Sequence, residues 1–405
     1  MHPAILTEQE YGANNYHPLP VVLVKGQGVH VWDDAGKEYL DMMSAYSAVS
    51  HGHCHPELVK VLTEQVQTLN ITSRAFYNAN LGSFLQYACQ ITQQERALAM
   101  NTGVEAVETA IKVARKWGYT VKGVPSNQAE IIVCEGNFHG RTTTVVSFSS
   151  EPQYKDNFGP LTPGFKIIPY GDAEALKAAI TPNTVAFLVE PIQGESGISV
   201  PPPGYLKACE QLCRQHNVLL IADEIQCGLG RTGKLLACDH EDVKPDGVVL
   251  GKALGGGILP VSLFLTRAEV MDVLEPGDHG STFGGNPLSA AVGLAALRTL
   301  MVDNMIGNAA EQGKYFIQQL KNLPNPLIRE VRGKGLFIGL EIDPAVSARK
   351  VCLKLLENGL LTKDTHGTVI RLCPPLVITR AQIDSAVRII QQSLHELAES
   401  EPHVA

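Results

Sequence analysis

The sequence of 405 residues lacks the features that mark membrane, secreted and nucleic-acid-binding proteins. Its longest apolar runs, such as residues 218–222, are far too short to span a bilayer. The N-terminus, MHPAILTEQEYG, has neither the basic stretch and apolar core of a signal peptide nor the arginine-rich character of a transit peptide. The net charge is −8 and no basic run stands out, which argues against nucleic acid and acidic membrane surfaces as partners. We therefore expect a cytoplasmic protein.

The cysteines do not form a disulfide pattern. They number nine, are scattered, and occur in a chain without a secretory signal, so reduced thiols are expected. Cys209 and Cys213 lie one helical turn apart, and we interpret them as a packed pair of small residues. No repeat, low-complexity segment or linker interrupts the chain. Its composition, 44% hydrophobic and 18% charged, is that of a globular protein long enough for more than one domain.

Short apolar runs rich in β-branched residues recur through the middle of the chain. Continuous apolar runs of this length are typical of strands that are buried on both faces of a sheet. Helical patterns separate the runs, for example over residues 173–180 and 205–216. This alternation predicts an α/β fold with parallel strands. The runs are Ile131–Cys134, Val185–Val189, Val218–Ile221 and Val248–Leu250.

The pattern changes from about residue 303 onward and indicates a smaller α+β unit. The N-terminal segment, with an apolar run at residues 29–32 and a turn at residues 34–36, is able to pair with that unit. The elements expected in the smaller unit are a helical stretch after residue 303, an apolar segment at 331–340, a helix over 348–358, a strand at 369–372 and a final helix from Arg380. We therefore predict an N-terminal segment over residues 1–46, a large domain over 47–302 and a small domain over 303–405.

Polar residues follow three of the predicted strands. Glu190 comes after the second run, Asp223 and Glu224 after the third, and Lys252 shortly after the fourth. Because ligands of open α/β sheets bind beyond the carboxyl ends of the strands, we expect these side chains in one crevice. A carboxylate at the buried position of Asp223 is costly unless it meets a cation, such as a protonated ring nitrogen, an arginine or a metal. A structural acid that caps a neighbouring helix explains the same residue.

Lys252 lies between an apolar run and the glycine-rich residues 253–257. A lysine in such a buried, apolar setting has a depressed pKa and is nucleophilic. The pair Gly251-Lys252 is also the core of a P-loop. That alternative fails, because Asp246 stands where the first glycine is needed and Ala253 stands where a serine or threonine must bind magnesium.

Residues 101–105 open a strongly helical stretch that ends near Trp117. Gly103 at the start of this helix lets the backbone approach a ligand, and the free N–H groups there attract a phosphate. An ordinary helix capped by Thr102 or Asn101 accounts for the same residues.

Two arginines are candidates for binding carboxylates. Phe138 and Arg141 lie close together in the loop after the first apolar run, which suits stacking on a ring and binding of a carboxylate. A surface turn with an exposed arginine is the alternative. Arg371, after Val369-Ile370, is equally ambiguous by itself.

A cluster of histidines raises the question of a metal site. His51, His53 and His55 alternate along the chain, but Gly52 and Pro56 indicate a turn. No second cluster has the spacing of zinc ligands. We predict no metal site.

Taken in order, these segments resemble the class III aminotransferases of pyridoxal-phosphate (PLP) fold type I, over nearly the whole chain. The resemblance implies a large PLP-binding domain with a mainly parallel seven-stranded sheet flanked by helices, and a smaller α+β domain built from both chain ends. It also implies PLP as the cofactor. The motifs that carry it are NTGVE at 101–105, NFHGRT at 137–142, EPIQGE at 190–195, DEIQ at 223–226, GKA at 251–253 and GSTFGGNP at 280–287.

Matched position by position, the resemblance implies roles around the cofactor ring. Lys252 would carry PLP as a Schiff base and later move the proton between substrate and cofactor. Asp223 would pair with the pyridinium nitrogen. Gln226 would lie beside the ring hydroxyl, and Phe138 would stack on the ring.

The resemblance also implies how the phosphate is held. Gly103 and Val104 would bind it through their backbone N–H groups. Ser281 and Thr282 would reach the phosphate of the neighbouring subunit's cofactor. This sharing implies a homodimer.

Three further motifs are similar to those of the family members that use ornithine: YGANNYHPLP at 11–20, SAYSAV at 44–49 and TSRAFYN at 72–78. The similarity implies transfer of the δ-amino group of L-ornithine to 2-oxoglutarate, which gives glutamate and glutamate 5-semialdehyde, a precursor of pyrroline-5-carboxylate. Tyr16 and Arg141 would hold the α-amino and carboxylate end of ornithine, with Tyr46 in the same pocket. Arg371 would be masked by Glu195 for the diamine and released for the keto acid.

Other functions stay open on the sequence. The amino donor is acetylornithine, 4-aminobutyrate or lysine in related enzymes, and a non-catalytic PLP-binding relative belongs to another class altogether. One departure concerns His139, since some relatives carry a second large aromatic residue after the stacking phenylalanine. We expect this difference to affect the wall of the substrate pocket rather than the cofactor site.

Overall fold

Seven strands form the central sheet, in the order β4-β10-β9-β8-β7-β5-β6. Strand β10 is antiparallel to both of its neighbours, and the pairs among β9, β8, β7, β5 and β6 are all parallel. The structure, a computed structural model, describes residues 2–400 and confirms the predicted α/β fold with its mainly parallel sheet. The strands are β4 (Arg96–Met100), β5 (Glu130–Cys134), β6 (Phe165–Ile168), β7 (Thr184–Val189), β8 (Leu219–Asp223), β9 (Gly247–Leu250) and β10 (Ser262–Thr266).

Both faces of this sheet are buried, because successive side chains of a strand point to opposite faces. In β8, Leu220 and Ala222 join one hydrophobic cluster, whereas Leu219 and Ile221 join another. The first cluster includes Cys209 and Cys213 of a covering helix, so these cysteines belong to the core as interpreted from their spacing. Two-sided burial is the reason that the strands are continuous apolar runs in the sequence.

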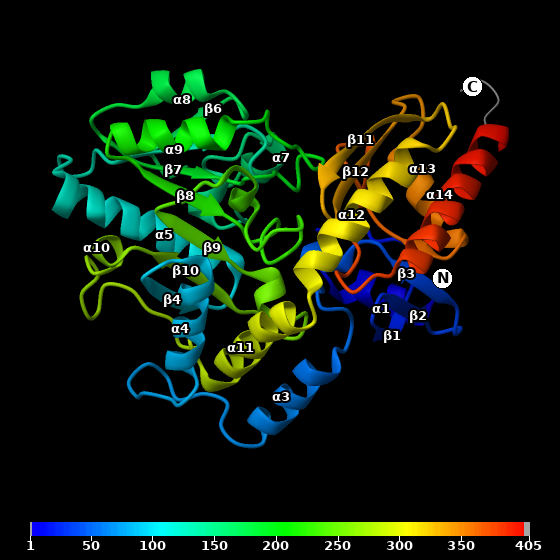
Figure 1. Cartoon of the computed structure of the whole chain (residues 1–405), viewed down its shortest axis with the longest axis horizontal. Coiled ribbons are helices and arrows are strands. Elements are labelled where there is room, and N and C mark those ends of the chain that lie inside the picture. The colour runs from blue at the N-terminus through cyan, green and yellow to red at the C-terminus, as the bar shows by residue number, and fades with distance from the viewer. Residues whose placement is uncertain (1, 401–405) are drawn as a thin grey trace.

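Helices cover the sheet and connect its strands (Figure 1). The predicted helix after residue 101 is α5, which Thr102 and Glu105 begin with a reciprocal capping box. The helices of this region are α3 (Pro56–Val66), α4 (Leu81–Thr92), α5 (Gly103–Trp117), α6 (Thr143–Val146), α7 (Pro152–Lys155), α8 (Ala173–Ala179), α9 (Tyr205–Gln215), α10 (Ala268–Met271) and α11 (Pro287–Val302). Shorter helical turns are α2 (Ser44–Ser47), η1 (Gly118–Lys122), η2 (Ala237–Glu241) and η3 (Lys252–Gly255).

Two smaller sheets lie in a second lobe with α12, α13 and α14 (Figure 1). One has the order β1-β2-β3-β13, so strands from the N-terminal segment pair with a strand near the C-terminus. The other has the order β11-β12-β15-β14. The elements are β1 (Leu23–Gln27), β2 (His30–Asp33), β3 (Glu38–Asp41), α12 (Met305–Lys321), β11 (Ile328–Lys334), β12 (Phe337–Ile342), α13 (Ala348–Glu357), β13 (Leu360–Leu361), β14 (Asp364–Thr365), β15 (Val369–Leu372) and α14 (Arg380–Ser400). The boundaries at residues 46 and 302 stay predictions.

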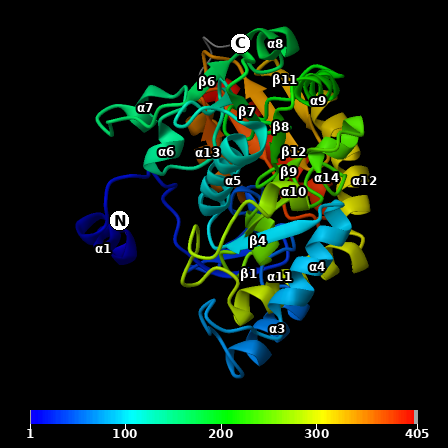
Figure 2. The ribbon, with the colours of Figure 1, turned by 90° about the vertical axis from the view of Figure 1, so that its left-hand side faces the viewer.

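Helix α1 (Pro3–Tyr11) projects from the molecule in Figure 2, and its N-cap residue His2 meets Asp34 of the second lobe at 2.8 Å. None of its residues is buried. The segment that follows it carries Tyr16 towards the second lobe, where the ring lies 6.0 Å from the Lys363 Nζ atom.

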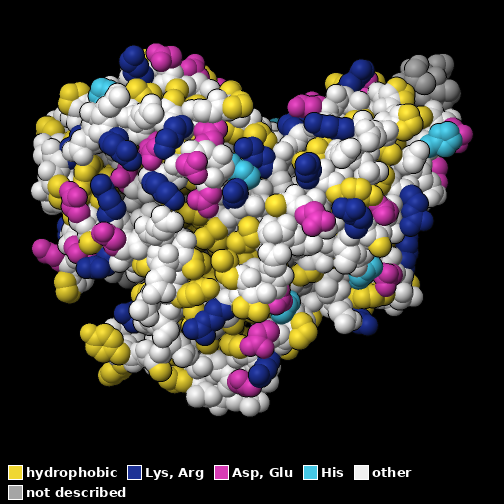
Figure 3. Space-filling model, viewed as in Figure 1, with side chains coloured by type: hydrophobic (Ala, Val, Ile, Leu, Met, Phe, Trp, Pro, Cys, Tyr) yellow, Lys and Arg dark blue, Asp and Glu magenta, His cyan; other side chains and the backbone are white. Residues whose placement is uncertain are grey.

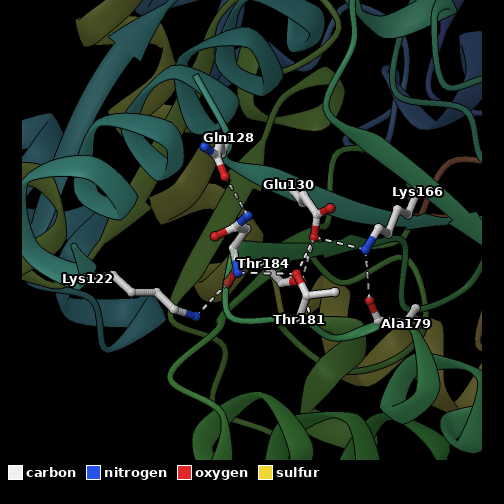
Figure 4. Close-up of polar contacts among 8 residues, drawn as sticks. Lys122, Gln128, Glu130, Lys166, Ala179, Thr181 and Thr184 are labelled. Atoms are coloured by element: carbon white, nitrogen blue, oxygen red, sulfur yellow. Dashed lines mark hydrogen bonds and ion pairs between the residues drawn. The ribbon is translucent and has the colours of Figure 1, made fainter. Parts of the chain in front are cut away.

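A polar network joins the amino ends of β5, β6 and β7 (Figure 4). The Glu130 carboxylate accepts hydrogen bonds from Lys166 Nζ at 2.9 Å and from the Thr181 hydroxyl. Lys122 Nζ donates to the Thr184 carbonyl at 2.6 Å and to two carbonyls at the end of α9. These contacts fix the edge of the sheet that lies opposite the carboxyl ends of the strands.

The surface carries both signs of charge. On the face shown in Figure 3, Lys and Arg side chains are interspersed with Asp and Glu side chains over both lobes. Among residues 2–400 no single helix has the length and apolar character needed to cross a membrane, and only α11 and α12 taken together, bent by 58° where they meet, pass on those two criteria.

Candidate active site

The candidate active site lies at the carboxyl edge of the seven-stranded sheet. Glu190 directly follows β7, Asp223 ends β8, and Lys252 follows β9 after one glycine. A cavity of about 180 Å³ lies among them, below the range of about 300–1,000 Å³ typical of drug-sized ligands, so it suits a single small ring. Six of the residues that the sequence singled out for a cofactor line it: Gly103, Val104, Phe138, Asp223, Gln226 and Lys252.

Lys252 is held in an unusual backbone conformation, with a φ of 45°. A residue other than glycine in this left-handed region is strained, and such strain persists where the surroundings enforce it. Burial lowers the pKa of the Lys252 amine below its ordinary value, although the charges of Glu195 and Asp223 oppose this shift. A larger fraction of the amine is therefore neutral and nucleophilic than in an exposed lysine.

Asp223 is buried behind the cavity and has two partners. Its carboxylate accepts a hydrogen bond from the Ile225 backbone N–H at 3.0 Å and meets His139 Nδ1 at 2.7 Å. Burial works against protonation of His139, but the hydrogen bond and the charge of Asp223, together with the charge of Glu190, outweigh it and raise the pKa of the imidazole. His139 also lines the cavity, so the expectation that it affects the wall of the substrate pocket stays a prediction. His139 belongs to the support of Asp223.

Glu190 adds a second buried acid beside this pair. Its carboxyl group accepts a hydrogen bond from the Phe138 N–H at 3.0 Å. Burial raises the pKa of Glu190 to about 8, with nearby Asp223 acting in the same direction and His139 opposing it. Glu190 is therefore mostly protonated at neutral pH, whereas its neighbour Asp223 is hydrogen-bonded to His139.

The glycines around the cavity are required by close packing. A Cβ atom on Gly103 would lie 2.9 Å from the Ile225 side chain, and one on Gly194 would lie 1.4 Å from Gln226 Oε1. Gly103 is therefore needed for the close packing of Ile225 against the start of α5, and it also allows a ligand to approach there. Thr102 is the N-cap of the same helix. The two interpretations left open by the sequence are compatible.

A second part of the site centres on Arg371, which lies on β15 in the other lobe. Its guanidinium meets Glu195 Oε1 at 2.6 Å, and the same oxygen accepts a hydrogen bond from Gln226 Nε2 at 3.2 Å. Burial disfavours the charge on Glu195, but Arg371, Lys252 and the hydrogen bond from Gln226 together outweigh burial and lower the pKa of the carboxyl group. The Arg371 side chain is buried and that of Glu195 is partly exposed, so the attraction between the two charges is only partly screened by water. Gln226 connects this pair to the cavity.

Tyrosine rings cover the Arg371–Glu195 pair. The Tyr46 ring centre lies 4.9 Å from the Arg371 guanidinium, and the Tyr46 hydroxyl lies 3.4 Å from Lys363 Nζ. Tyr16 is 64% exposed and contacts the site through Lys363. Nothing in the sequence pattern marked Lys363, because it lies in a short connection without a recognisable motif.

The remaining predicted residues lie outside the cavity. Arg141 is exposed, with its guanidinium 4.2 Å from the Tyr154 ring centre and 5.7 Å from that of Phe138. Ser281 accepts a hydrogen bond from Asn101 Nδ2 at 3.0 Å, directly before α5. Thr282 is exposed. Their assigned roles stay predictions.

A larger groove of about 800 Å³ lies at the opposite edge of the sheet. Its acidic groups are engaged within the protein: Glu210 by Lys207 and Arg214, and Asp246 by Arg267. The ligand-binding edge of an α/β sheet is the carboxyl edge, whereas this groove lies at the amino edge. The smaller cavity is therefore the candidate active site.

The three clustered histidines have separate partners. His51 Nε2 contacts the Ala296 carbonyl at 2.9 Å, His53 meets Asp41 at 2.7 Å, and His55 meets Asp303 at 3.1 Å. Within residues 2–400 no group of three His, Cys, Asp or Glu side chains is placed to hold a metal ion.

Comparisons with known proteins fit this geometry. The ornithine aminotransferase of Brevibacillus brevis is 56% identical over 387 residues, which is 96% of each chain. The structure of the Toxoplasma gondii ornithine aminotransferase, crystallised with oxidised glutathione and with partial occupancy of PLP at its active site, superposes with a TM-score of 0.97 at 46% identity and covers 98% of this chain and 95% of its own. The acetylornithine aminotransferase of Elizabethkingia anophelis gives a TM-score of 0.89 at 49% identity, covering 97% and 98%. Residues 11–394 match the family described as Aminotransferase class-III, and the chain belongs to that family.

Proposed function

We propose that this class III aminotransferase transfers the δ-amino group of L-ornithine to 2-oxoglutarate with PLP as its cofactor. The observation that carries the proposal is the Arg371–Glu195 pair at 2.6 Å, which contacts Tyr46 through Arg371 and the lining of the Lys252 cavity through Gln226. Identities of 54–57% to curated ornithine aminotransferases over nearly the whole chain support it. The expected products are glutamate and glutamate 5-semialdehyde, which cyclises to pyrroline-5-carboxylate.

The residues of the cavity fit PLP. Lys252 offers an amine of lowered pKa for covalent attachment, and Asp223 offers a buried acceptor for a protonated ring nitrogen. Phe138 offers an aromatic face, and the start of α5 at Gly103 offers free backbone N–H groups for a phosphate. PLP, when bound, would supply the electron sink that stabilises negative charge on the substrate carbon.

The protein itself supplies proton transfer and orientation. Lys252 is the general base of the site, because its amine is the basic group of lowered pKa in the cavity. Asp223 is held in place by the hydrogen bond with His139 at 2.7 Å, and it would orient a ring nitrogen of the cofactor. A positioned general base contributes about 10²–10⁴-fold to the rate, so loss of Lys252 removes turnover and attachment together.

One site must accept two different substrates in turn. The reacting carbon of ornithine, next to the δ-amine, carries no carboxylate, so a free Arg371 would favour the wrong end of the molecule. Glu195 neutralises Arg371 for that half-reaction. The keto acid brings its own carboxylate, which replaces Glu195 as the partner of Arg371. Tyr16, Tyr46 and Arg141 would hold the carboxylate and α-amino end of ornithine.

Acetylornithine is the second candidate donor, because the Elizabethkingia relative with that activity in its name is 49% identical. The acetyl group of acetylornithine removes the charge on the α-amine. Activity with ornithine, unlike activity with acetylornithine, therefore tests whether the site tolerates a charged α-amine. The homodimer, with Ser281 and Thr282 reaching a neighbouring phosphate, and the cytoplasmic location are further parts of the proposal.

The deciding experiment adds L-ornithine, without a keto acid, to the purified PLP-loaded protein. We expect the absorption of protein-bound PLP near the visible edge to be lost and pyridoxamine phosphate to form in stoichiometric amount. Acetylornithine, 4-aminobutyrate and lysine are compared at equal concentration, and Lys252→Ala serves as the control that binds cofactor without turnover. An unchanged spectrum with ornithine, alongside conversion by another donor, would overturn the assignment.

A further inference from the structure

Residues 44–47 form a single turn of left-handed helix, although none of them is glycine. Their φ angles are 43°, 47°, 59° and 73°, and the ψ angles of Ala45 and Tyr46 are 53° and 42°. Side chains disfavour this region because the Cβ atom approaches the following carbonyl oxygen. Four strained residues in a row therefore need support from outside the turn.

The support comes from a buried arginine. Arg231 is fully buried, and its Nη2 donates to Ser44 Oγ at 3.2 Å and to Ser50 Oγ at 2.9 Å. The Ser44 hydroxyl in turn donates to the Cys373 carbonyl at 2.6 Å, and the Ser50 hydroxyl donates to the Ser47 carbonyl at 2.9 Å. Arg231 therefore holds the first residue of the turn directly and the last through Ser50.

The same guanidinium reaches the second lobe. Arg231 Nη1 donates to the carbonyls of Leu336 and Pro374, at 3.0 Å and 2.5 Å. No described carboxylate forms an ion pair with it. Carbonyls and hydroxyls accept from Nη1 and Nη2, and the buried Nε has no hydrogen-bond partner among the described residues. Burial lowers the pKa of Arg231 to about 10, which leaves it charged at neutral pH. A planar fork of donors suits this task in a way that a lysine would not.

The turn determines where Tyr46 lies. With the backbone left-handed, the Tyr46 ring stands 4.9 Å from the Arg371 guanidinium, on β15 of the other lobe. Arg231 contacts the chain on both sides of that contact, at Ser44 and at Pro374, three residues beyond Arg371. The position of the ring over the arginine thus depends on one guanidinium that ties the turn to the second lobe.

We propose that Arg231 is a positioning residue that holds residues 44–47 in the left-handed turn and so fixes Tyr46 over the carboxylate-binding Arg371. The inference rests on the proposed function in one respect only, namely that the amino acceptor that binds at Arg371 is 2-oxoglutarate. Arg231 does not touch the cavity. It acts on substrate selection through Tyr46.

The kinetic test changes serine hydroxyls and keeps Arg231. Truncation of Arg231 would leave the buried carbonyls of Leu336 and Pro374 without a donor, so the variant would report on folding and not on positioning. Ser50→Ala removes one acceptor of Arg231, and Ser47→Ala is the matched control, since the buried Ser47 hydroxyl has no hydrogen-bond partner in the described structure. We expect Ser50→Ala to raise the KM for 2-oxoglutarate by about 3- to 10-fold, as one lost hydrogen bond allows, with kcat within about twofold. In a Tyr46→Ala background the same change has no further effect.

The stability test addresses the strain itself. Ala45→Gly relieves a left-handed residue and should raise the melting temperature, whereas Ala48→Gly, at a right-handed φ of −70°, should lower it. Equal effects of Ser50→Ala with and without Tyr46, or a lower melting temperature for Ala45→Gly, would overturn the proposal. If the wild type rejects 2-oxoglutarate, the proposed function fails, and the same comparison is made with the acceptor that it does use.

Discussion

Two buried carboxyl groups, 33 residues apart in the chain, lie side by side in the site with different partners. Asp223 has a hydrogen-bonded imidazole behind it, whereas Glu190 receives only one backbone N–H. A buried carboxyl group without a cationic partner takes up a proton, and one with such a partner does not. His139 therefore provides the side-chain partner that Asp223 has and that Glu190 lacks. The residue is part of the NFHGRT motif, but the sequence of the motif did not reveal this role.

Glu190 makes the stability of the protein depend on pH. Its folded pKa of about 8 lies above its unfolded value of 4.5, so the folded state binds more protons and stability falls as the pH rises from about 4.5 to 8. Glu190→Gln, a neutral replacement that keeps an acceptor for the Phe138 N–H, should stabilise the protein at pH 8 by a few kcal/mol. It should have little effect at pH 4.5. Thermal melting across this range measures it, with exposed Glu64→Gln as the control; parallel curves for wild type and Glu190→Gln would refute it.

Glu195→Gln removes the negative charge that covers Arg371. Because the charged hydrogen bond of 2.6 Å is lost, Arg371 becomes available to carboxylates in both half-reactions. We expect the preference for the δ-amine of ornithine over the α-amine of glutamate to fall by about 10-fold or more, the value of one charge-assisted hydrogen bond. Single-turnover rates with each donor give the ratio. An unchanged ratio would show that Glu195 does not mask Arg371.

At the scale of elements, the sequence predicted those strands and helices that are determined by the local pattern of apolar residues. Strands β5, β7, β8 and β9 were predicted to within a residue or two, because burial on both faces makes each a continuous apolar run. The left-handed turn at residues 44–47 was not predictable, since it contains no glycine and is imposed by Arg231, almost two hundred residues later. The same holds for Lys363, which only tertiary structure brings to Tyr46.

The network at the amino edge of the sheet should contribute to stability and not to catalysis. Hydrogen bonds from Thr181 and Lys166 outweigh the opposing effect of burial and lower the pKa of Glu130. Its contribution is therefore present above the unfolded pKa and is lost as the pH falls through the folded value. Glu130→Gln should cost about 1–2 kcal/mol near pH 7, with kcat and KM unchanged within about twofold. Chemical denaturation at pH 7 and at progressively lower pH checks it: the difference from wild type should be largest at pH 7 and should decrease as the pH falls below 4.5.

At the scale of the molecule, the two lobes meet at the site that must accept two different substrates in turn. Lys252 and Asp223 come from the large sheet, whereas Arg371 comes from β15 in the other lobe. The short motifs shared with the family identified most of these residues from the sequence. The distances between residues of different lobes could not be predicted in this way, because they depend on the folded chain. The pairing of Arg371 with Glu195 was a hypothesis from sequence, and its geometry at 2.6 Å required the structure.

Two loops with exposed aromatic residues lie beside each other on the surface. Phe76 and Tyr77 are 69% and 97% exposed, and Phe283 is 57% exposed. Asn78 Nδ2 donates to the Gly285 carbonyl at 3.1 Å, which joins the two loops. Exposed apolar groups gathered in this way mark an interaction surface, and Ser281 and Thr282 lie in the second loop. A homodimer across this surface would carry the Ser281–Thr282 loop towards a neighbouring cofactor phosphate.

Mixing two defective subunits tests whether the active site is shared. One variant is Lys252→Ala, and the other carries Ser281→Ala and Thr282→Ala, which should weaken PLP binding. If the loop acts across a twofold interface, each mixed dimer has one site with both defects and one intact site. Random reassortment of equal amounts should then restore roughly a quarter of wild-type activity at limiting PLP. If Ser281 and Thr282 serve their own chain, every site keeps a defect, and mixing restores nothing. Sedimentation of both variants and of a Tyr77→Asp variant, which should dissociate, would show whether the loops form the dimer contact.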